Sequence, residues 1–310
     1  MDTSLVLKEE FRTVLATEVE KVTGVKVTSV GERFESWDSF AFLVTTENGK
    51  KYVGKIFRFP DWPPPGKLAE VTKVLTKHNI AHEITVYIVH NHPTFKFGWQ
   101  LTEFVEGGNV KEAIENGLIT RGDYFKKVGS VLKEVHKIRL SFFGSIHDTS
   151  HQYKTFKGLV SEELGYQNFD TLPQKYQHYK EIISSAKKEI LKLVENDNFV
   201  STLVHDDMGA SNVLWNGGDL ILIDWVDCIA GPPLRDFATM TFREDTPVVD
   251  SIEQGYSQEI DRQELKLHQL MRLVRLGHFY YSEDKNYKEF EVMMERAKIL
   301  LEKDTPFGTH

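Results

Sequence analysis

The sequence has little of what marks secreted or membrane proteins. It contains a single cysteine, Cys228, so no disulfide can form within the chain, and this favours a reducing compartment. No apolar run approaches 18 residues, the length of a membrane-spanning helix. Residues 1–22 carry acids and have amphipathic helical spacing, unlike a secretory signal. We therefore expect a cytoplasmic protein with no membrane partner.

An excess of basic charge is also missing. The chain has 38 Lys and Arg residues and 46 Asp and Glu residues, which gives a formal net charge of −8. Nucleic-acid-binding proteins normally show a basic surplus, so no nucleic-acid partner is expected. Mild acidity suits a cationic ligand, but it more often serves solubility, so the net charge does not identify the ligand.

The first third of the chain has the pattern of an antiparallel sheet. A leading helix is expected at residues 4–22, with Leu15 and Val19 on its apolar face. In "SFAFLVTTENGKKYVGKIFRF", Asn48-Gly49 separates two β-rich runs, which is a strong hairpin signal. One helix is expected at residues 66–78, after the prolines at 63–65.

Beyond Gly107-Gly108 the pattern becomes helical, at residues 121–139, 174–195 and 262–303. Residues 199–225 are the exception, because they form short apolar runs around polar loops. The sequence thus predicts an α+β fold with two lobes: residues 1–106 with an antiparallel sheet and one main helix, and a mostly helical lobe at 107–310. A ligand site is expected between lobes of this kind.

A polar constellation interrupts the apolar runs of the second lobe. In residues 203–214, "LVHDDMGASNVL", the spacing His205-x-Asp207-x-x-x-x-Asn212 has the form of a kinase catalytic loop. Asp224 ends the next strand, "LILID". Asn212 and Asp224 are hard oxygen donors suited to Mg²⁺ when phosphates supply further ligands. A carboxylate at Asp207 is then placed to orient or deprotonate a hydroxyl, as phosphoryl transfer requires.

The segment "LVHDDMGASNVLWNGGDLILIDWVDCIAGPPLRDFATM" resembles the aminoglycoside phosphotransferase and choline kinase-like family of small-molecule kinases. The family pattern is H-G-D-x-x-x-x-N, then I-D-[WF], then a further Asp before a helix. The matching residues are His205, Asp207, Asn212, Asp224 and Asp236. The resemblance implies a bilobal protein-kinase-like fold, ATP or GTP as co-substrate, and Mg²⁺ at residues 221–227. It also implies that His205 and Asp236 support the loop structurally.

The first lobe is expected to bind the nucleotide. Lys55 in "KYVGKIF" matches the V-A-I-K strand whose lysine meets the α- and β-phosphates. Glu70 on the following helix is its expected partner, and Glu83 is a weaker candidate. Lys55 and Glu70, each taken alone, are more typical of solvent-facing side chains, and the downstream motif is what favours the pair.

A G-x-G-x-x-G loop is absent, and only Gly31 lies in "GERFESWDSF". The resemblance implies that Ser36 and Ser39 contact the phosphates in its place. It also implies that the carbonyl of Glu103 and the N–H of Val105 meet the adenine edge.

The leading hypothesis is transfer of the γ-phosphate of ATP or GTP to a hydroxyl of a small molecule. Candidate acceptors are aminoglycoside-type or other antibiotics, amino alcohols and sugars. A-P-E, H-R-D and D-F-G are missing, which argues against a protein acceptor. Two alternatives stay open: a non-catalytic nucleotide-binding pseudokinase, and an HD-type metal phosphohydrolase at His205-Asp206. Acids such as Glu163 are interpreted as solvated charges.

The spacing also distinguishes the two adjacent aspartates. Asp206 stands where the related enzymes carry glycine, and on an extended segment its side chain would point away from Asp207. We therefore predict that Asp206→Gly keeps activity and that Asp207→Asn loses most of it. Nucleotide turnover with a panel of hydroxyl compounds measures both, and the reverse result would overturn the register of the whole site.

Overall fold

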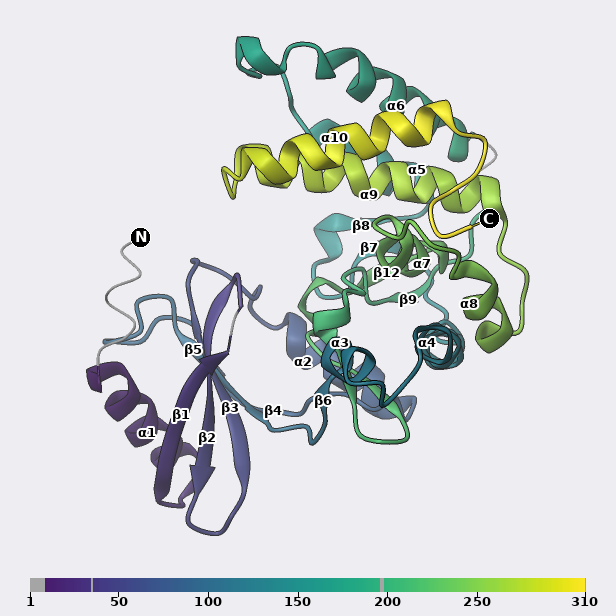
Figure 1. The fold of residues 1–310 in the computed structure, drawn as a ribbon. Helices are drawn as coiled ribbons and strands as arrows, with labels where there is room; N and C mark the ends of the chain where they lie inside the picture. Colours follow the sequence, from purple (N-terminus) through teal and green to yellow (C-terminus); the bar gives the residue numbers. More distant parts are fainter. Residues whose placement is uncertain (1–8, 35, 196–197, 310) are drawn as a thin grey trace. The chain divides into compact units, whose positions relative to one another are not determined.

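The computed structural model describes residues 9–34, 36–195 and 198–309. The first part of the predicted leading helix, residues 4–8, lies outside these residues. The chain divides into an N-terminal unit, Met1–Gly107, and a C-terminal unit, Gly108–His310. Strands dominate the first unit and helices the second, so the predicted α+β class is confirmed (Figure 1).

The N-terminal unit contains one five-stranded antiparallel sheet in the order β1-β2-β3-β5-β4. Its elements are α1 (Glu9–Thr23), β1 (Val27–Phe34), β2 (Ser39–Thr46), β3 (Lys51–Phe57), α2 (Lys67–Lys77), β4 (Thr85–Val89) and β5 (Trp99–Glu103). The Asn48-Gly49 turn joins β2 to β3, with Thr45 paired to Lys51. Gly49 has a φ of 79°, a left-handed conformation that glycine adopts without steric cost.

Helix α1 packs its predicted apolar face on this sheet. Leu15 and Val19 are fully buried against strand residues that include Phe42 and Trp99. A Cβ on Gly54 of β3 would lie 3.0 Å from the Leu15 side chain, so glycine allows the helix to approach closely. The helix therefore supports the back of the strand that carries Lys55.

The C-terminal unit combines two small sheets with a set of helices. The sheets have the orders β11-β10-β6 and β8-β7-β12-β9. Its strands are β6 (Gly108–Asn109), β7 (Phe143–Ser145), β8 (Gln152–Tyr153), β9 (Thr202–Val204), β10 (Val213–Trp215), β11 (Leu220–Leu222) and β12 (Ile229–Gly231). Its α-helices are α3 (Val110–Glu115), α4 (Arg121–Val135), α5 (Phe156–Tyr166), α6 (Tyr179–Leu193), α7 (Leu234–Thr241), α8 (Val249–Tyr256), α9 (Arg262–Ser282) and α10 (Tyr287–Glu302). Short 3₁₀ turns include η4 (Ala210–Asn212) and η5 (Trp225–Asp227).

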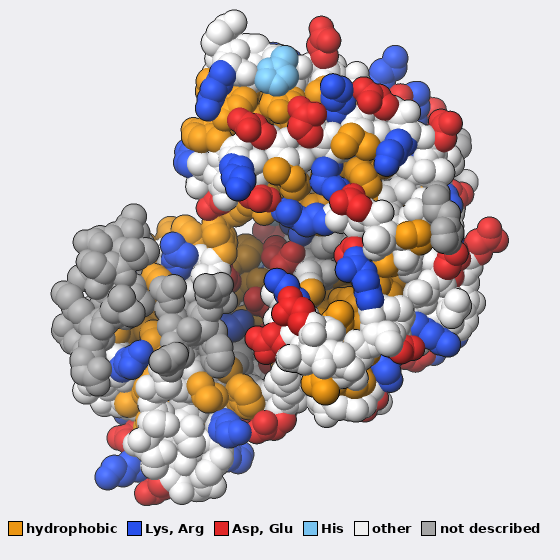
Figure 2. Space-filling view, in the orientation of Figure 1, with side chains coloured by type: hydrophobic (Ala, Val, Ile, Leu, Met, Phe, Trp, Pro, Cys, Tyr) orange, Lys and Arg blue, Asp and Glu red, His pale blue; other side chains and the backbone are white. Residues whose placement is uncertain are grey.

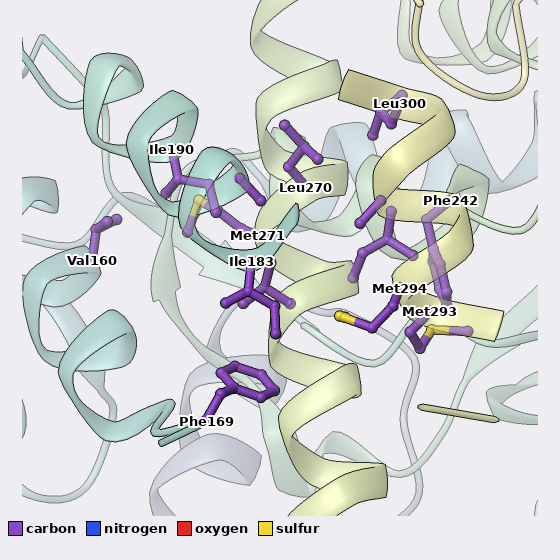
Figure 3. Packing of buried hydrophobic residues seen from close by; sticks show 14 of the residues in the cluster. Val160, Phe169, Ile183, Ile190, Phe242, Leu270, Met271, Met293, Met294 and Leu300 are labelled. Carbon is purple, nitrogen blue, oxygen red and sulfur yellow. The ribbon is translucent and has the colours of Figure 1, made fainter. Parts of the chain in front are cut away.

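The main core of this unit lies between α6, α9 and α10. Figure 3 shows side chains such as Ile183, Met271 and Met294 meeting there from the three helices. Burying a side chain of this size contributes about 1.5–3 kcal/mol, so together these contacts hold α9 firmly. The core matters for function because α9 carries Arg272 and Arg275 on a different face.

The outer surface is mixed in charge. Over α6, α9 and α10, Lys and Arg side chains lie among Asp and Glu side chains on the face drawn in Figure 2. Within the described part of the chain, no helix combines the length and the apolar character needed to cross a membrane.

Helices α4 and α8 approach each other closely at two glycines. A Cβ on Gly129 of α4 would overlap the carbonyl oxygen of Ile252, and one on Gly255 of α8 would overlap that of Lys126. A Cβ on Gly122, on the same α4 helix, would have the Ser251 hydroxyl as its nearest contact, at 3.9 Å. Glycine at 129 is thus required by packing, and at 122 it is not.

We predict that Gly129→Ala lowers the free energy of unfolding by about 1–3 kcal/mol, because the methyl group forces the two backbones apart. Gly122→Ala is the matched control and should leave stability unchanged or raise it, since alanine favours helix. Urea unfolding measures both. Equal stabilities for the two variants would contradict the close packing.

Candidate active site

The predicted catalytic loop, residues 203–214, begins within the buried strand β9 and leaves it after Val204. The backbone N–H of His205 donates to Oδ2 of Asp236 at 3.0 Å, and that of Asp206 donates to Oδ1 at 2.8 Å. Asp236 lies in the first turn of α7 and is fully buried. Bonds of this kind to a carboxylate are stronger than neutral ones, so Asp236 fixes the start of the loop.

Two histidines complete this support. His136, the C-cap of α4, places Nε2 3.0 Å from Oδ2 of Asp236, and its Nδ1 lies 3.2 Å from the Tyr256 hydroxyl. His205 places Nε2 2.9 Å from the carbonyl of Ile223, which can only accept, and its Nδ1 accepts the N–H of Asp207. Both nitrogens of each ring are thus occupied by protein groups, which is a structural arrangement.

Asp207 lies at the exposed end of the loop. Its side chain is 40% exposed, whereas that of Asp206 is 3% exposed. The Asn212 amide donates to Oδ2 of Asp207 at 2.8 Å and to its backbone carbonyl at 2.9 Å. The loop therefore closes on itself and presents one carboxylate to solvent.

Asn212 and Asp224 are placed at the same end of the β10–β11 ladder. Val213 pairs with Leu222, and the N–H of Ile223 donates to the Asn212 carbonyl at 3.0 Å. Asp224 follows directly, with φ 64° and ψ 58°. This left-handed conformation is uncommon for an aspartate, and such strain is typical of functional positions.

The donor set fits Mg²⁺. The Asn212 nitrogen donates to Asp207, which leaves Oδ1 as the acceptor of this amide, and the Ser211 hydroxyl lies 3.4 Å from that oxygen. A carboxylate and an amide oxygen are hard donors, and Mg²⁺ in such sites takes the rest of its ligands from phosphates and water. No group of three or more His, Cys, Asp or Glu side chains able to hold a metal occurs among the described residues. The HD-type phosphohydrolase alternative, which needs such a cluster, gains no support.

The backbone at Asp206 is not extended, contrary to the expectation from the sequence. Its φ is 60°. The buried carboxylate receives Arg235 Nε at 2.9 Å and Nη2 at 3.0 Å, and it also pairs with Arg275. Burial raises the pKa of Asp206, but the charges of Arg235, Arg275 and Arg272 outweigh burial and hold the pKa well below its usual range. Glycine would suit this φ, yet it would remove the carboxylate that pairs with Arg235 and Arg275. We therefore expect Asp206→Gly to destabilise the fold, and the expectation that it keeps activity applies to the chemistry of the folded protein alone.

The surroundings of Glu163 also differ from those expected. Interpreted from sequence as a solvated charge, it instead accepts Arg235 Nη2 at 2.9 Å and Nη1 at 3.1 Å. Arg235 thus lies between two carboxylates, and its side chain is only 6% exposed. We call Glu163, Asp206, Arg235 and Arg275 the buried ion-pair cluster.

Sequence reasoning missed the arginines of α9. Arg272 Nη2 lies 2.8 Å from Oδ1 of Asp207, and its Nη1 donates to the Asp206 carbonyl at 2.9 Å. Arg275, one turn later, pairs with Asp206 and lies 3.9 Å from Asp227. The available signal was two arginines three residues apart within the apolar run "LMRLVRLG".

In the N-terminal unit, Lys55 lies at the centre of the sheet, paired with Ala41 and Gln100. Glu70 was its expected partner, but the Glu70 carboxylate is half exposed and pairs with Lys73 at 2.6 Å. The Lys55–Glu70 pair therefore stays a prediction. Helix α2 buries Leu68, Val71 and Leu75, and Glu70 lies off this packed face.

The loop before β2 is organised around Asp38. Ser36 donates to Asp38 at 2.6 Å and lies 3.1 Å from the Ser39 hydroxyl, and Trp62 donates to the other oxygen at 2.9 Å. Burial raises the pKa of Asp38, but the Ser36 hydrogen bond and the Lys55 charge outweigh it and lower the pKa. Sequence reasoning did not single out Asp38. Phosphate contacts by Ser36 and by Ser39, which is 1% exposed, stay predictions, as do adenine contacts at Glu103 and Val105.

The model of the Phosphotransferase enzyme family matches residues 30–268. The match covers most of the chain, so the protein belongs to this family and is a phosphotransferase. No curated protein is similar enough in sequence to match it.

Solved structures of aminoglycoside kinases share the fold. The thermostable mutant of aminoglycoside phosphotransferase APH(4)-Ia with ADP and hygromycin B has a TM-score of 0.73 and 15% identity, covering 93% of this chain and 97% of that chain. Spectinomycin phosphotransferase APH(9)-Ia with ADP and spectinomycin has a TM-score of 0.62 and 16% identity, covering 93% and 98%. The streptomycin–ATP complex of APH(2'')-IIa has a TM-score of 0.61 and 15% identity, covering 97% and 98%. The predicted kinase-like fold and family are confirmed.

The buried ion-pair cluster leads to a stability prediction. Asp206→Asn should lower the free energy of unfolding by about 3–5 kcal/mol, because it removes one of the two carboxylates that pair with the buried Arg235 and the carboxylate that pairs closely with Arg275. Asp245→Asn removes the pair between the exposed Asp245 carboxylate and Arg296 and should cost at most about 1 kcal/mol. Urea unfolding at neutral pH compares the two, and similar losses would contradict the importance of burial.

The same variant has a pH signature. The unfolded aspartate binds a proton near pH 4, whereas folded Asp206 stays ionised because its pKa is lowered. Its contribution is therefore complete above about pH 4 and is lost as pH falls below that value. Asp206→Asn should show a weaker decline of stability below about pH 4 than the wild type.

Proposed function

We propose that the protein transfers the γ-phosphate of ATP, in a Mg²⁺-dependent reaction, to a hydroxyl of a small molecule. The observation that carries the proposal is the loop in which Asp207 is held by Asn212 beside Asp224. An exposed carboxylate next to two hard oxygen donors matches the needs of phosphoryl transfer: an oriented acceptor and a held metal. Family membership supports the same class of reaction.

Each residue then has a role. The Asp207 carboxylate accepts the hydrogen of the acceptor hydroxyl and directs its oxygen at the γ-phosphorus. The new P–O bond forms as the bond to the β-phosphate oxygen breaks, and ADP leaves with that electron pair. Asn212 and Asp224 would hold Mg²⁺, which neutralises charge on the phosphates when bound. Asp236 and His205 keep the loop in place.

Nucleotide contacts belong to the N-terminal unit in this proposal. Lys55 is assigned to the α- and β-phosphates, Ser36 and Ser39 to the phosphate-covering loop, and the backbone of Glu103 and Val105 to adenine. We propose ATP rather than GTP as the co-substrate, because similar structures are complexes with ADP or ATP. A non-catalytic pseudokinase is the weaker alternative, because Asp207, Asn212 and Asp224 are all present.

Two observations bear on the acceptor. Similar folds are bound to hygromycin B, spectinomycin and streptomycin, which favours an aminoglycoside-type hydroxyl compound. Near Asp207, however, Asp206 and Glu163 are already paired with arginines, which leaves less free negative charge for a polycation. A hydroxyl metabolite of lower charge is therefore the second candidate.

The test is ADP release from Mg-ATP with a panel of hygromycin B, spectinomycin, choline, homoserine and simple sugars. We expect at least one acceptor to raise turnover well above hydrolysis, and Asp207→Ala to lower that turnover by about 10²–10⁴-fold, the range of general acid–base contributions. Mg-ATP should still bind to the variant, as isothermal calorimetry would show.

The proposal has clear opposing outcomes. Equal turnover by Asp207→Ala would remove the assigned role of Asp207. Nucleotide binding without transfer to any acceptor, and without hydrolysis, would favour the pseudokinase.

A further inference from the structure

We propose that Arg272 of α9 is a positioning residue for Asp207, and this inference rests on the proposed function. Its guanidinium makes two contacts with the catalytic loop. Nη2 lies 2.8 Å from Oδ1 of Asp207, and Nη1 donates to the Asp206 carbonyl at 2.9 Å. One planar group therefore connects the reacting side chain to the backbone immediately before it.

The contact completes the fixation of the carboxylate. Oδ2 of Asp207 receives Asn212 at 2.8 Å, while Oδ1 receives Arg272. The two donors come from η4 and α9, on opposite oxygens, so rotation of the carboxylate breaks at least one bond. Because the Asp207 side chain is 40% exposed, its orientation depends mainly on these two polar contacts. Each oxygen keeps a further lone pair that can accept from a substrate hydroxyl.

Arg272 is itself rigidly placed. Its side chain is 11% exposed, and Leu273 and Val274, which follow it in α9, are fully buried in the core of the C-terminal unit. Its Nε is buried and has no hydrogen-bond partner among the residues that the structure describes. Leaving a buried donor without a partner costs free energy, so the guanidinium is oriented toward the loop at the expense of its own complete hydrogen bonding.

The loop itself contains no lysine or arginine. Residues 208–211 read "MGAS", so the positive charge beside Asp207 comes from a residue 65 positions later. Lysine at 272 would keep the charge, but it lacks the planar fork that reaches the Asp207 carboxylate and the Asp206 carbonyl together. The structure thus assigns to Arg272 a geometric role that charge alone does not replace.

The test measures kcat and KM for Arg272→Gln and Arg272→Lys with Mg-ATP and the best acceptor of the panel, and also ATP hydrolysis by water. Misplacement of a reacting group by about 1 Å costs about 100-fold, so Arg272→Gln should lower kcat by about that factor. The KM for Mg-ATP should change by less than about twofold, because binding of the nucleotide is not involved. Arg272→Lys should fall between Arg272→Gln and the wild type.

Arg243→Gln is the matched control, because it removes an exposed arginine that pairs with Glu289 at 2.8 Å. It should keep the kcat of the wild type. Thermal unfolding is followed for all variants, and if Arg272→Gln does not fold, Arg272→Lys carries the comparison.

A double mutant separates positioning from general stability. If Arg272 acts through Asp207, then Asp207→Asn with Arg272→Gln should lose no more activity than Asp207→Asn alone, since residues that act as a unit are not additive. Multiplied losses, or a kcat for both Arg272 variants equal to that of Arg243→Gln, would overturn the inference while the proposed function stands. A wild-type enzyme with neither transfer nor hydrolysis would overturn both.

Discussion

The site depends on the hydrogen bonds that the buried carboxylate of Asp236 accepts. This carboxylate accepts the consecutive N–H groups of His205 and Asp206, and His136 bonds to one of the same oxygens. A buried carboxylate is unfavourable unless donors surround it, so the chain can bury Asp236 only with the loop in this conformation. The same requirement therefore shapes the loop and stabilises helix α7 against strand β9.

A second layer of buried charge connects the loop to more distant helices. Arg235 of α7 lies between Asp206 and Glu163 of α5, and Arg275 of α9 approaches Asp206 from another side. Buried ion pairs add little net stability, because desolvation offsets much of their attraction, but breaking one is costly. Their effect is to select one arrangement of α5, α7 and α9 around the loop. That arrangement also brings Arg272 within reach of Asp207.

Local spacing predicted the parts of the site that are close in sequence. Asp207, Asn212 and Asp224 flank the β10–β11 hairpin, and its strand pairing brings the segments of Asn212 and Asp224 to the same end. Their catalytic and metal-binding roles stay predictions. The arginines of α9 could not be placed this way, because their contact with the loop depends on tertiary packing across about 65 residues. The exposed position of Glu70 has a local cause instead. The buried stripe of Leu68, Val71 and Leu75 was readable in the sequence, and it excludes Glu70 from the packed face.

The two adjacent aspartates differ in role: Asp206 supports the structure, and Asp207 is the proposed reacting group. Asp206 has a φ of 60°, which places its side chain in the buried ion-pair cluster while Asp207 stays 40% exposed. A left-handed aspartate is disfavoured by about 1–2 kcal/mol, which explains why glycine is the usual choice at such a turn. Here the conformation is compatible with aspartate because Arg235 and Arg275 compensate its buried charge. Asp206 and these arginines therefore form one structural unit, and a change in either is expected to require a change in the other.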